Sequence, residues 1–260
     1  MAKTTCPVAG IDRAAGTIAP VAETSYELTV AEVRPETREA VSVVLEVPAE
    51  HAEQFAFAPG QFLTLAVPSE RTGLVARCYS LCVPPGEPLT VTVKRTRDGY
   101  ASGWINDHLA VGDVLRVLPP SGIFTPKDRS ADLLLLAAGS GITPVMSIVR
   151  AAMRDGTGHV VLLDANRDEE SVIFAEPLRR LAEAHPDRLV VEHWLETDRG
   201  LPTQEQLRDF AAPYAGRDVF LCGPAPFMAV ANAALRELGV PRARRHQERF
   251  VSLATNPFVD

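Results

Sequence analysis

The spacing of hydrophobic and polar positions changes character once along this chain, near residue 126. Before that point, short apolar stretches are separated by turn residues such as Pro59-Gly60 and Asp98-Gly99. They predict strands at 26–33, 40–47, 62–68, 75–82, 89–95 and 114–118, with one helical insert at 102–109. Six short strands within about a hundred residues favour a small antiparallel barrel.

After Pro126 the pattern alternates between short apolar runs and longer amphipathic segments. Strands are predicted at 132–138, 159–165, 188–195, 218–222 and 244–249, and helices at 144–154, 174–185, 203–211 and 225–238. This alternation predicts a doubly wound parallel sheet, which binds ligands at the carboxyl ends of its strands. The expected organisation is a disordered tail over 1–24, a six-stranded barrel over 25–126, an α/β domain over 127–250, and a tail or linker over 251–260.

The segment from Leu133 to Pro144 carries the clearest chemical signal. Four leucines and two alanines predict a strand buried on both faces, and Gly139-Ser140-Gly141 follows it directly. Thr143 is predicted to be the N-cap and Pro144 the first residue of the next helix. Glycines that allow close approach, followed by a helix N-terminus, predict a cradle for a dinucleotide pyrophosphate.

Composition narrows the classes of partner and site. The formal net charge is −7 and no block of Lys and Arg residues is present, so a nucleic-acid partner is not expected. Apolar runs are too short to span a bilayer and the N-terminus lacks a signal-peptide core, so a cytoplasmic protein without a membrane partner is expected. The four cysteines and six histidines have no metal-ligand spacing, so no metal site is expected.

Two features of the predicted barrel point to a second phosphate-bearing ligand. Arg77 and Tyr79 are expected on one face of a strand, where Arg can bind phosphate and Tyr can pack on a flat ring. A solvated Arg beside a packed Tyr explains these two residues equally well. Gly99 and Ser102 open the helical insert and provide a second candidate anion site, for which a capped surface helix is the alternative. Together the two sites suit a flavin that carries a pyrophosphate.

Several motifs occur in the order found in ferredoxin–NADP reductase-like flavoproteins, which this sequence resembles over about residues 25–250. They are Arg77-x-Tyr79-Ser80, Gly99-x-x-Ser102, Gly112-Asp113, Pro120-x-Gly122-x-Phe124, Gly139-Ser-Gly-Ile-Thr-Pro144 and Cys222-Gly-Pro224. Asn166-Arg167-Asp168 and Ser171 to Phe174 resemble most closely the reductases of bacterial ring-attacking oxygenases, above all those of 3-ketosteroid 9α-hydroxylases.

The resemblance implies FAD as the bound flavin, with FMN as an alternative. It implies that Arg77 binds the flavin pyrophosphate, that Tyr79 packs on the isoalloxazine, and that Ser80 hydrogen-bonds near N5. The other flavin-binding residues it implies are Val93, Lys94, Arg95, Gly99, Tyr100, Ala101 and Ser102, with Glu248 and Phe250 at the flavin edge.

On the nucleotide side, the resemblance implies that residues Gly139, Ser140, Gly141, Thr143 and Pro144 hold the pyrophosphate of NADH or NADPH. Asn166, Arg167 and Asp168 are placed near the adenosine ribose, and Cys222, Gly223 and Pro224 beside the nicotinamide. The catalytic group implied is Ser80, Cys222 and Glu248, with Cys222 as a positioning group and not a nucleophile. Arg167 and Asp168 stand side by side and leave the choice of nucleotide open, while the resemblance leans to NADH.

The implied activity is hydride transfer from the nucleotide to flavin, followed by single-electron transfer to a [2Fe–2S] ferredoxin and a terminal oxygenase. The resembling reductases carry that ferredoxin as a C-terminal domain, and this sequence lacks the required Cys-x4-Cys-x2-Cys set, so a separate carrier or a removed domain is expected. A flavin or ferric reductase without a ferredoxin, and a non-catalytic nucleotide-binding electron-transfer subunit, remain alternatives.

Overall fold

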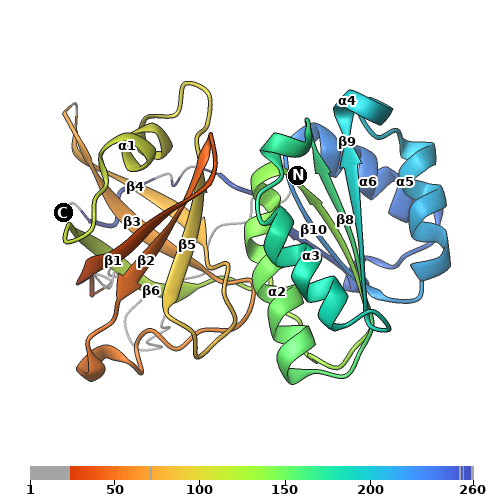
Figure 1. The fold of residues 1–260 in the computed structure, drawn as a ribbon, viewed down its shortest axis with the longest axis horizontal. Coiled ribbons are helices and arrows are strands. Elements are labelled where there is room, and N and C mark those ends of the chain that lie inside the picture. The colour runs from red at the N-terminus through yellow and green to blue at the C-terminus, as the bar shows by residue number, and fades with distance from the viewer. Residues whose placement is uncertain (1–23, 71, 252, 254, 259–260) are drawn as a thin grey trace, which may run out of the picture.

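The computed structural model describes residues 24–70, 72–251, 253 and 255–258, which fold into two lobes (Figure 1). The tail predicted for residues 1–24 lies outside the described residues except for residue 24. No helix in the part of the chain that the structure describes is long and apolar enough to cross a membrane.

The first lobe is a six-stranded antiparallel sheet with the strand order β4-β3-β6-β1-β2-β5. Its elements are β1 (Tyr26–Thr37), β2 (Ala40–Glu46), β3 (Phe62–Ser69), β4 (Gly73–Ser80), β5 (Leu89–Lys94), α1 (Tyr100–His108) and β6 (Val114–Ser121). A bridge between Leu81 and Val91 joins the two edges of the sheet and closes it into a barrel. Helix α1 packs on the barrel through the buried side chains of Ala101 and Ile105.

The second lobe is a five-stranded sheet with the order β11-β10-β7-β8-β9, in which every pairing is parallel. Its strands are β7 (Leu133–Ala138), β8 (Val160–Asn166), β9 (Leu189–Leu195), β10 (Asp218–Cys222) and β11 (Arg245–Glu248). Its helices are α2 (Ile142–Asp155), α3 (Ala175–Ala184), α4 (Glu196–Arg199), α5 (Gln204–Ala211) and α6 (Ala225–Glu237). These two lobes confirm the fold class predicted from the hydrophobic pattern.

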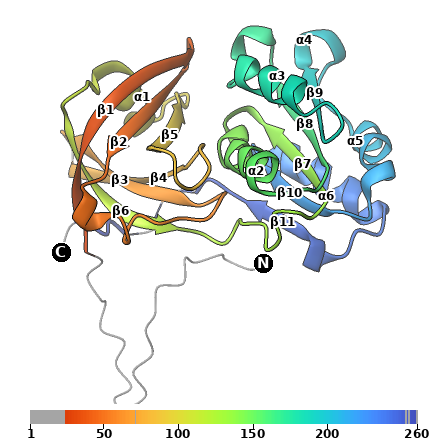
Figure 2. The same cartoon turned by 60° about the horizontal axis from the view of Figure 1, so that its bottom comes forward.

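Strand β7 shows why its sequence is continuously apolar. Leu133 and Leu135 pack into the layer formed with α2 and α3, whereas Leu134 and Leu136 pack into the layer formed with α5 and α6. Figure 2 shows these helices on the two sides of the sheet. A strand that is covered on both faces has no solvent-facing position for a polar residue.

The lobes meet along α2. The Ser147 hydroxyl donates a hydrogen bond to the Val83 carbonyl (2.6 Å), and Arg150 pairs with Glu87 (2.7 Å). After β11 the chain crosses back to the barrel (Figure 1). There Phe258 is buried against Ala66, Ala76 and Leu118. The contacts of α2 and the C-terminal segment that returns to the barrel therefore both connect the two lobes.

Candidate functional site

The loop after β7 forms a tight cradle at the carboxyl edge of the parallel sheet. Residues Gly139–Gly141 form a single 3-10 turn, in which Gly139 has φ +54°, a conformation that favours glycine. A Cβ atom built on Gly141 would lie 2.1 Å from the Cys222 carbonyl oxygen, so only glycine fits there. No side chain caps α2, whose positive dipole end points to this loop and favours an anion there, although the Ile142 N–H donates to the Gly139 and Ser140 carbonyls.

The capping role predicted for Thr143 is wrong. Helix α2 begins at Ile142 with Gly141 as its N-cap, which places Thr143 and Pro144 inside the first turn. The Thr143 hydroxyl instead donates a hydrogen bond to the Ser140 carbonyl (3.0 Å) and stiffens the turn. The 3-10 turn leads straight into the helix, so the helix starts before the residue that sequence preference favours as a cap.

Cys222 and Glu248 end neighbouring strands, opposite each other in the β10–β11 pairing. Cys222 is 1% exposed, and burial, reinforced by the nearby Glu248 carboxylate, raises the pKa of its thiol. Burial also raises the pKa of Glu248. A thiol held in its neutral form is a poor nucleophile, and the positioning role of Cys222 stays a prediction.

The flavin-side residues Arg77, Tyr79 and Ser80 lie at the end of β4. Arg77 donates one hydrogen bond, to the Ala76 carbonyl (2.8 Å), and has no carboxylate partner within the described part of the chain. Burial raises the pKa of the Tyr79 phenol, which keeps its O–H protonated. Ser80 is a buried residue, and its hydroxyl makes no hydrogen bond to any described residue. A guanidinium without a carboxylate partner, beside two hydroxyl groups that make no hydrogen bond within the described residues, fits the phosphate and ring atoms of a flavin nucleotide.

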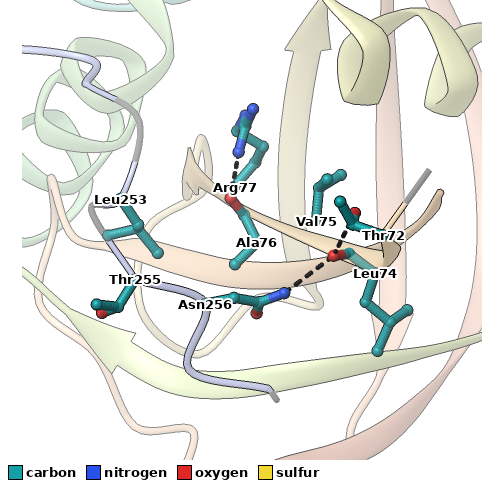
Figure 3. Close-up of a pocket in the computed structure, with 8 residues that line it drawn as sticks. All are labelled: Thr72, Leu74, Val75, Ala76, Arg77, Leu253, Thr255 and Asn256. Atoms are coloured by element: carbon teal, nitrogen blue, oxygen red, sulfur yellow. Dashed lines mark hydrogen bonds between the residues drawn. The ribbon is translucent and has the colours of Figure 1, made fainter. Parts of the chain in front are cut away.

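A cavity of about 330 Å³ lies between β4 and the C-terminal segment (Figure 3). Val75 and Arg77 lie on one side of β4, and Leu74 and Ala76 lie on the side that faces this segment, as the predicted alternation requires. Asn256 donates a hydrogen bond to the Leu74 carbonyl (2.9 Å) and fixes the segment on the strand. The residues placed in the predicted tail or linker over 251–260 thus include several that pack on the barrel.

Lys94 and Arg95 follow each other on the chain but lie in different surroundings. A Cβ atom built on Gly139 would lie 3.7 Å from the Lys94 Nζ atom, so this amine reaches the nucleotide cradle from the barrel. Arg95 instead forms a bidentate ion pair with Asp107 (2.6 and 2.8 Å). Lys94 therefore brings a positive charge of the first lobe to the cradle of the second.

The start of α1 differs from its prediction. The helix begins at Tyr100, two residues before the predicted start, and its N-cap Gly99 provides no side-chain cap. The Ser102 hydroxyl accepts from Thr96 N–H (3.0 Å) and donates to the Gly99 carbonyl (3.3 Å). Val93 is fully buried in the barrel core, so it can reach a cofactor only through its backbone. Ala101 is also buried in that core, while Tyr100 is half exposed.

The end of β8 holds Asn166, followed by Arg167 and Asp168. Asp168 caps the 3-10 turn Glu169–Ser171 by accepting from Ser171 N–H (2.9 Å), and it pairs with Arg167 (2.9 Å). At the C-terminal side, Phe250 is 49% exposed, two residues after Glu248. Gly223, next to Cys222 and Pro224, packs closely on Ala138.

Sequence reasoning missed a buried polar cluster on β8 and β9. The Asp164 side chain is fully buried; its Oδ2 accepts from Asn166 (2.9 Å) and lies 3.3 Å from His193 Nδ1. Burial raises the pKa of Asp164, although His193, Asn166 and Lys94 act in the opposite direction. A polar residue within an apolar strand was the only sequence signal, because the partner on β9 is distant in the chain.

Comparisons with known proteins show which proteins this chain is similar to. Residues 135–233 match the family described as an oxidoreductase NAD-binding domain. The chain is 56% identical over 238 residues to the ferredoxin reductase component of 3-ketosteroid-9-alpha-monooxygenase from Rhodococcus rhodochrous, covering 91% of this chain and 68% of that protein. It is 35% identical over 244 residues to one of the subunits of the 1,2-phenylacetyl-CoA epoxidase from Escherichia coli, covering 87% of this chain and 68% of that protein.

Solved structures show the same two-lobed arrangement. A cytochrome P450 reductase from Amycolatopsis superposes with a TM-score of 0.69 at 26% identity, covering 92% of this chain and 73% of that one. The FAD/NAD-binding domain of a nitric oxide dioxygenase from Vibrio cholerae superposes with a TM-score of 0.69 at 25% identity, covering 86% of this chain and 98% of that one.

Proposed function

Since this chain belongs to the family of ferredoxin reductase components of 3-ketosteroid-9-alpha-monooxygenases, we propose that it passes electrons from NADH or NADPH, through FAD, to an iron–sulfur carrier of an oxygenase system. The family membership confirms the resemblance expected from the motifs. The chain is an NAD-binding oxidoreductase that uses a flavin. That the electron acceptor is an iron–sulfur carrier is part of the proposal.

The observation that carries the proposal is the closeness of the Lys94 amine to Gly139, where an added Cβ atom would lie 3.7 Å from Nζ. It brings an amine of the barrel to the cradle of the α/β lobe, so both lobes supply groups to one place. The neutral Cys222 thiol and the partly buried Glu248 lie opposite each other at the ends of β10 and β11, and Gly141 of the cradle packs against the Cys222 carbonyl. A nucleotide held in this cradle would have its reactive ring beside the boundary between the lobes.

Each side chain has a task in this arrangement that depends on its own chemistry. Arg77 would hold the flavin pyrophosphate, because its guanidinium lacks a carboxylate partner within the described residues. The Tyr79 and Ser80 hydroxyl groups would orient the ring, and Cys222 would position the nicotinamide as a neutral thiol. When bound, FAD would accept a hydride and release the electrons singly, so the protein contributes alignment and electrostatics.

The decisive experiment uses the purified protein. We expect it to be yellow, to release FAD on denaturation, and to bleach when NADH or NADPH is added without oxygen. A colourless protein that binds no added FAD or FMN would end the proposal. Chromatography of the released flavin distinguishes FAD from FMN.

A second measurement identifies the electron acceptor. We expect turnover with a plant-type [2Fe–2S] ferredoxin to exceed turnover with ferric citrate or free flavin. Faster reduction of ferric citrate or free flavin would identify a small-molecule reductase instead. A flavin-loaded protein that oxidises neither nucleotide would identify a non-catalytic subunit.

A further inference from the structure

The two lobes also touch at the turn between β1 and β2. Arg38 Nη1 lies 3.5 Å from Glu170 Oε2, and Arg167 Nη2 lies 3.9 Å from Glu39 Oε2. Both views place this turn beside the connection from β8 to α3 (Figures 1 and 2). The Glu39 carbonyl accepts a short hydrogen bond from Arg95 N–H (2.6 Å), which fixes the backbone that carries the carboxylate.

This contact lies where a dinucleotide places its adenosine ribose. Strand β8 is the second strand of the unit that contains the Gly139–Gly141 loop, and the ribose of a bound dinucleotide lies at the end of that strand. An acidic residue there favours a 2′-hydroxyl, and a free Arg favours a 2′-phosphate. Whether the Arg167 guanidinium is free or paired with carboxylates therefore affects which nucleotide the site accepts.

Arg167 is not a free cation. Its guanidinium donates to Asp168 (2.9 Å) and faces Glu39 across the lobe boundary. The hydrogen bond to Asp168, followed by the charges of Asp168, Glu39 and Glu196, raises the pKa of Arg167. Asp168 caps Ser171 with Oδ1 and pairs with Arg167 through Oδ2, and Glu39 is the further carboxylate that the other lobe adds.

A second observation points the same way. Asp164 Oδ1 and Asn166 Oδ1 lie on the same strand, are buried, and have no hydrogen-bond partner within the described residues. His193 Nδ1, beside Asp164 on the neighbouring strand, is buried without a hydrogen-bond partner in the described part of the chain as well. The Asn166 oxygen, on the last residue of β8, can accept a hydrogen bond. A ribose hydroxyl can donate a hydrogen bond, whereas an ionised phosphate adds only acceptors and negative charge.

We propose that Glu39, from the flavin-side lobe, neutralises Arg167 across the cleft so that the end of β8 accepts a 2′-hydroxyl and repels a 2′-phosphate, which selects NADH over NADPH. This inference rests on the proposed function, in which a reduced pyridine nucleotide is the electron donor. Glu39 acts through Arg167 and is a positioning residue for nucleotide choice.

The test is the ratio of kcat/KM for NADH to that for NADPH, measured with ferricyanide as the electron acceptor. Glu39→Gln is expected to lower this ratio about three- to fivefold, as for the loss of one exposed charge partner. The change should arise from a lower KM for NADPH, with kcat and KM for NADH unchanged. Glu39→Asp should keep most of the discrimination, and Glu32→Gln, which loses a carboxylate paired with Arg34 on the same strand, should leave it unchanged.

Two further measurements separate this electrostatic role from a structural one. In an Arg167→Ala background, Glu39→Gln should have no further effect on the ratio, because the group through which it acts is gone. Higher ionic strength should lower the NADH-to-NADPH ratio of kcat/KM in the wild-type protein, since salt screens exposed charges. Calorimetric binding of AMP and of 2′-phospho-AMP should show the same preference without any turnover.

An unchanged ratio in Glu39→Gln overturns the inference. Equal losses of NADH and NADPH turnover also overturn it, because they make Glu39 a structural contact only. If the wild-type protein oxidises neither nucleotide, the proposed function fails. In that case the Kd values of AMP and 2′-phospho-AMP for the same variants test the role of Glu39. Equal changes in both Kd values would overturn it.

Discussion

Gly141 packs directly against the backbone of Cys222, so that a Cβ atom on Gly141 would lie 2.1 Å from the Cys222 carbonyl oxygen. This contact joins the loop after β7 to the end of β10, the two strands between which the sheet changes direction. Open α/β sheets bind their ligands at this point. The positions of the pyrophosphate cradle and of the Cys222 thiol are therefore coupled.

Gly141→Ala should separate these two elements. Because the added methyl group meets backbone atoms, the loop must move, and we expect kcat/KM for the reduced nucleotide to fall at least about tenfold. Flavin content should match wild type. Gly216→Ala is the control, since a Cβ atom there meets nothing within 4 Å. Wild-type kinetics in Gly141→Ala would show that the loop does not hold the nucleotide.

Arg77→Ala should weaken retention of the flavin. A charge-assisted hydrogen bond to phosphate contributes about 1.5–3 kcal/mol, so the Kd for FAD should rise about 10- to 150-fold. Equilibrium dialysis with added FAD measures this change. Arg34→Ala is the control, because that guanidinium pairs with Glu32 and Glu36 on the barrel surface. Equal FAD affinity in Arg77→Ala and wild type would remove Arg77 from the site.

Cys222→Ala should slow reduction of the flavin by the nucleotide while the flavin stays bound. A misplaced nicotinamide lowers the hydride-transfer rate, by on the order of 10- to 100-fold. Anaerobic stopped-flow measurements follow this rate directly. Cys82→Ala removes another buried thiol, whose pKa burial raises to about 11, and should lower Tm without changing the rate. A wild-type rate in Cys222→Ala would place Cys222 away from the nicotinamide.

Most of the fold could be predicted from the sequence, because strands, helices and turns are set mainly by residues close together in the chain. The apolar run from Leu133 to Ala138 and the glycines after it led directly to β7 and its loop. Thr143 was assigned wrongly because the helix start depends on the turn packed against Cys222, which lies far away in the sequence. The Glu39–Arg167 and Asp164–His193 pairs were missed for the same reason. In each pair the two residues are far apart in the sequence and meet only in the folded chain.

The buried Asp164 should make stability depend on pH in a direction opposite to that of most ion-paired carboxylates. Burial raises its pKa in the folded protein, so the folded state holds this proton more tightly than the unfolded chain does. Its contribution to the free energy of unfolding is therefore greatest below the unfolded pKa of about 3.9. It decreases as the pH rises through the folded pKa.

Asp164→Asn imitates the protonated form at every pH. At pH 8 we expect the free energy of unfolding of the variant to exceed that of wild type by roughly 1 kcal/mol, which raises Tm by about 2–4 °C. This difference in stability should shrink towards pH 4. Asp132→Asn is the matched control with the opposite sign, because hydrogen bonds from His159 lower the pKa of Asp132. That variant should be less stable than wild type at pH 8 and approach it in acid. A lower Tm for Asp164→Asn at pH 8 would mean that His193 and Lys94 stabilise the ionised carboxylate more than burial destabilises it.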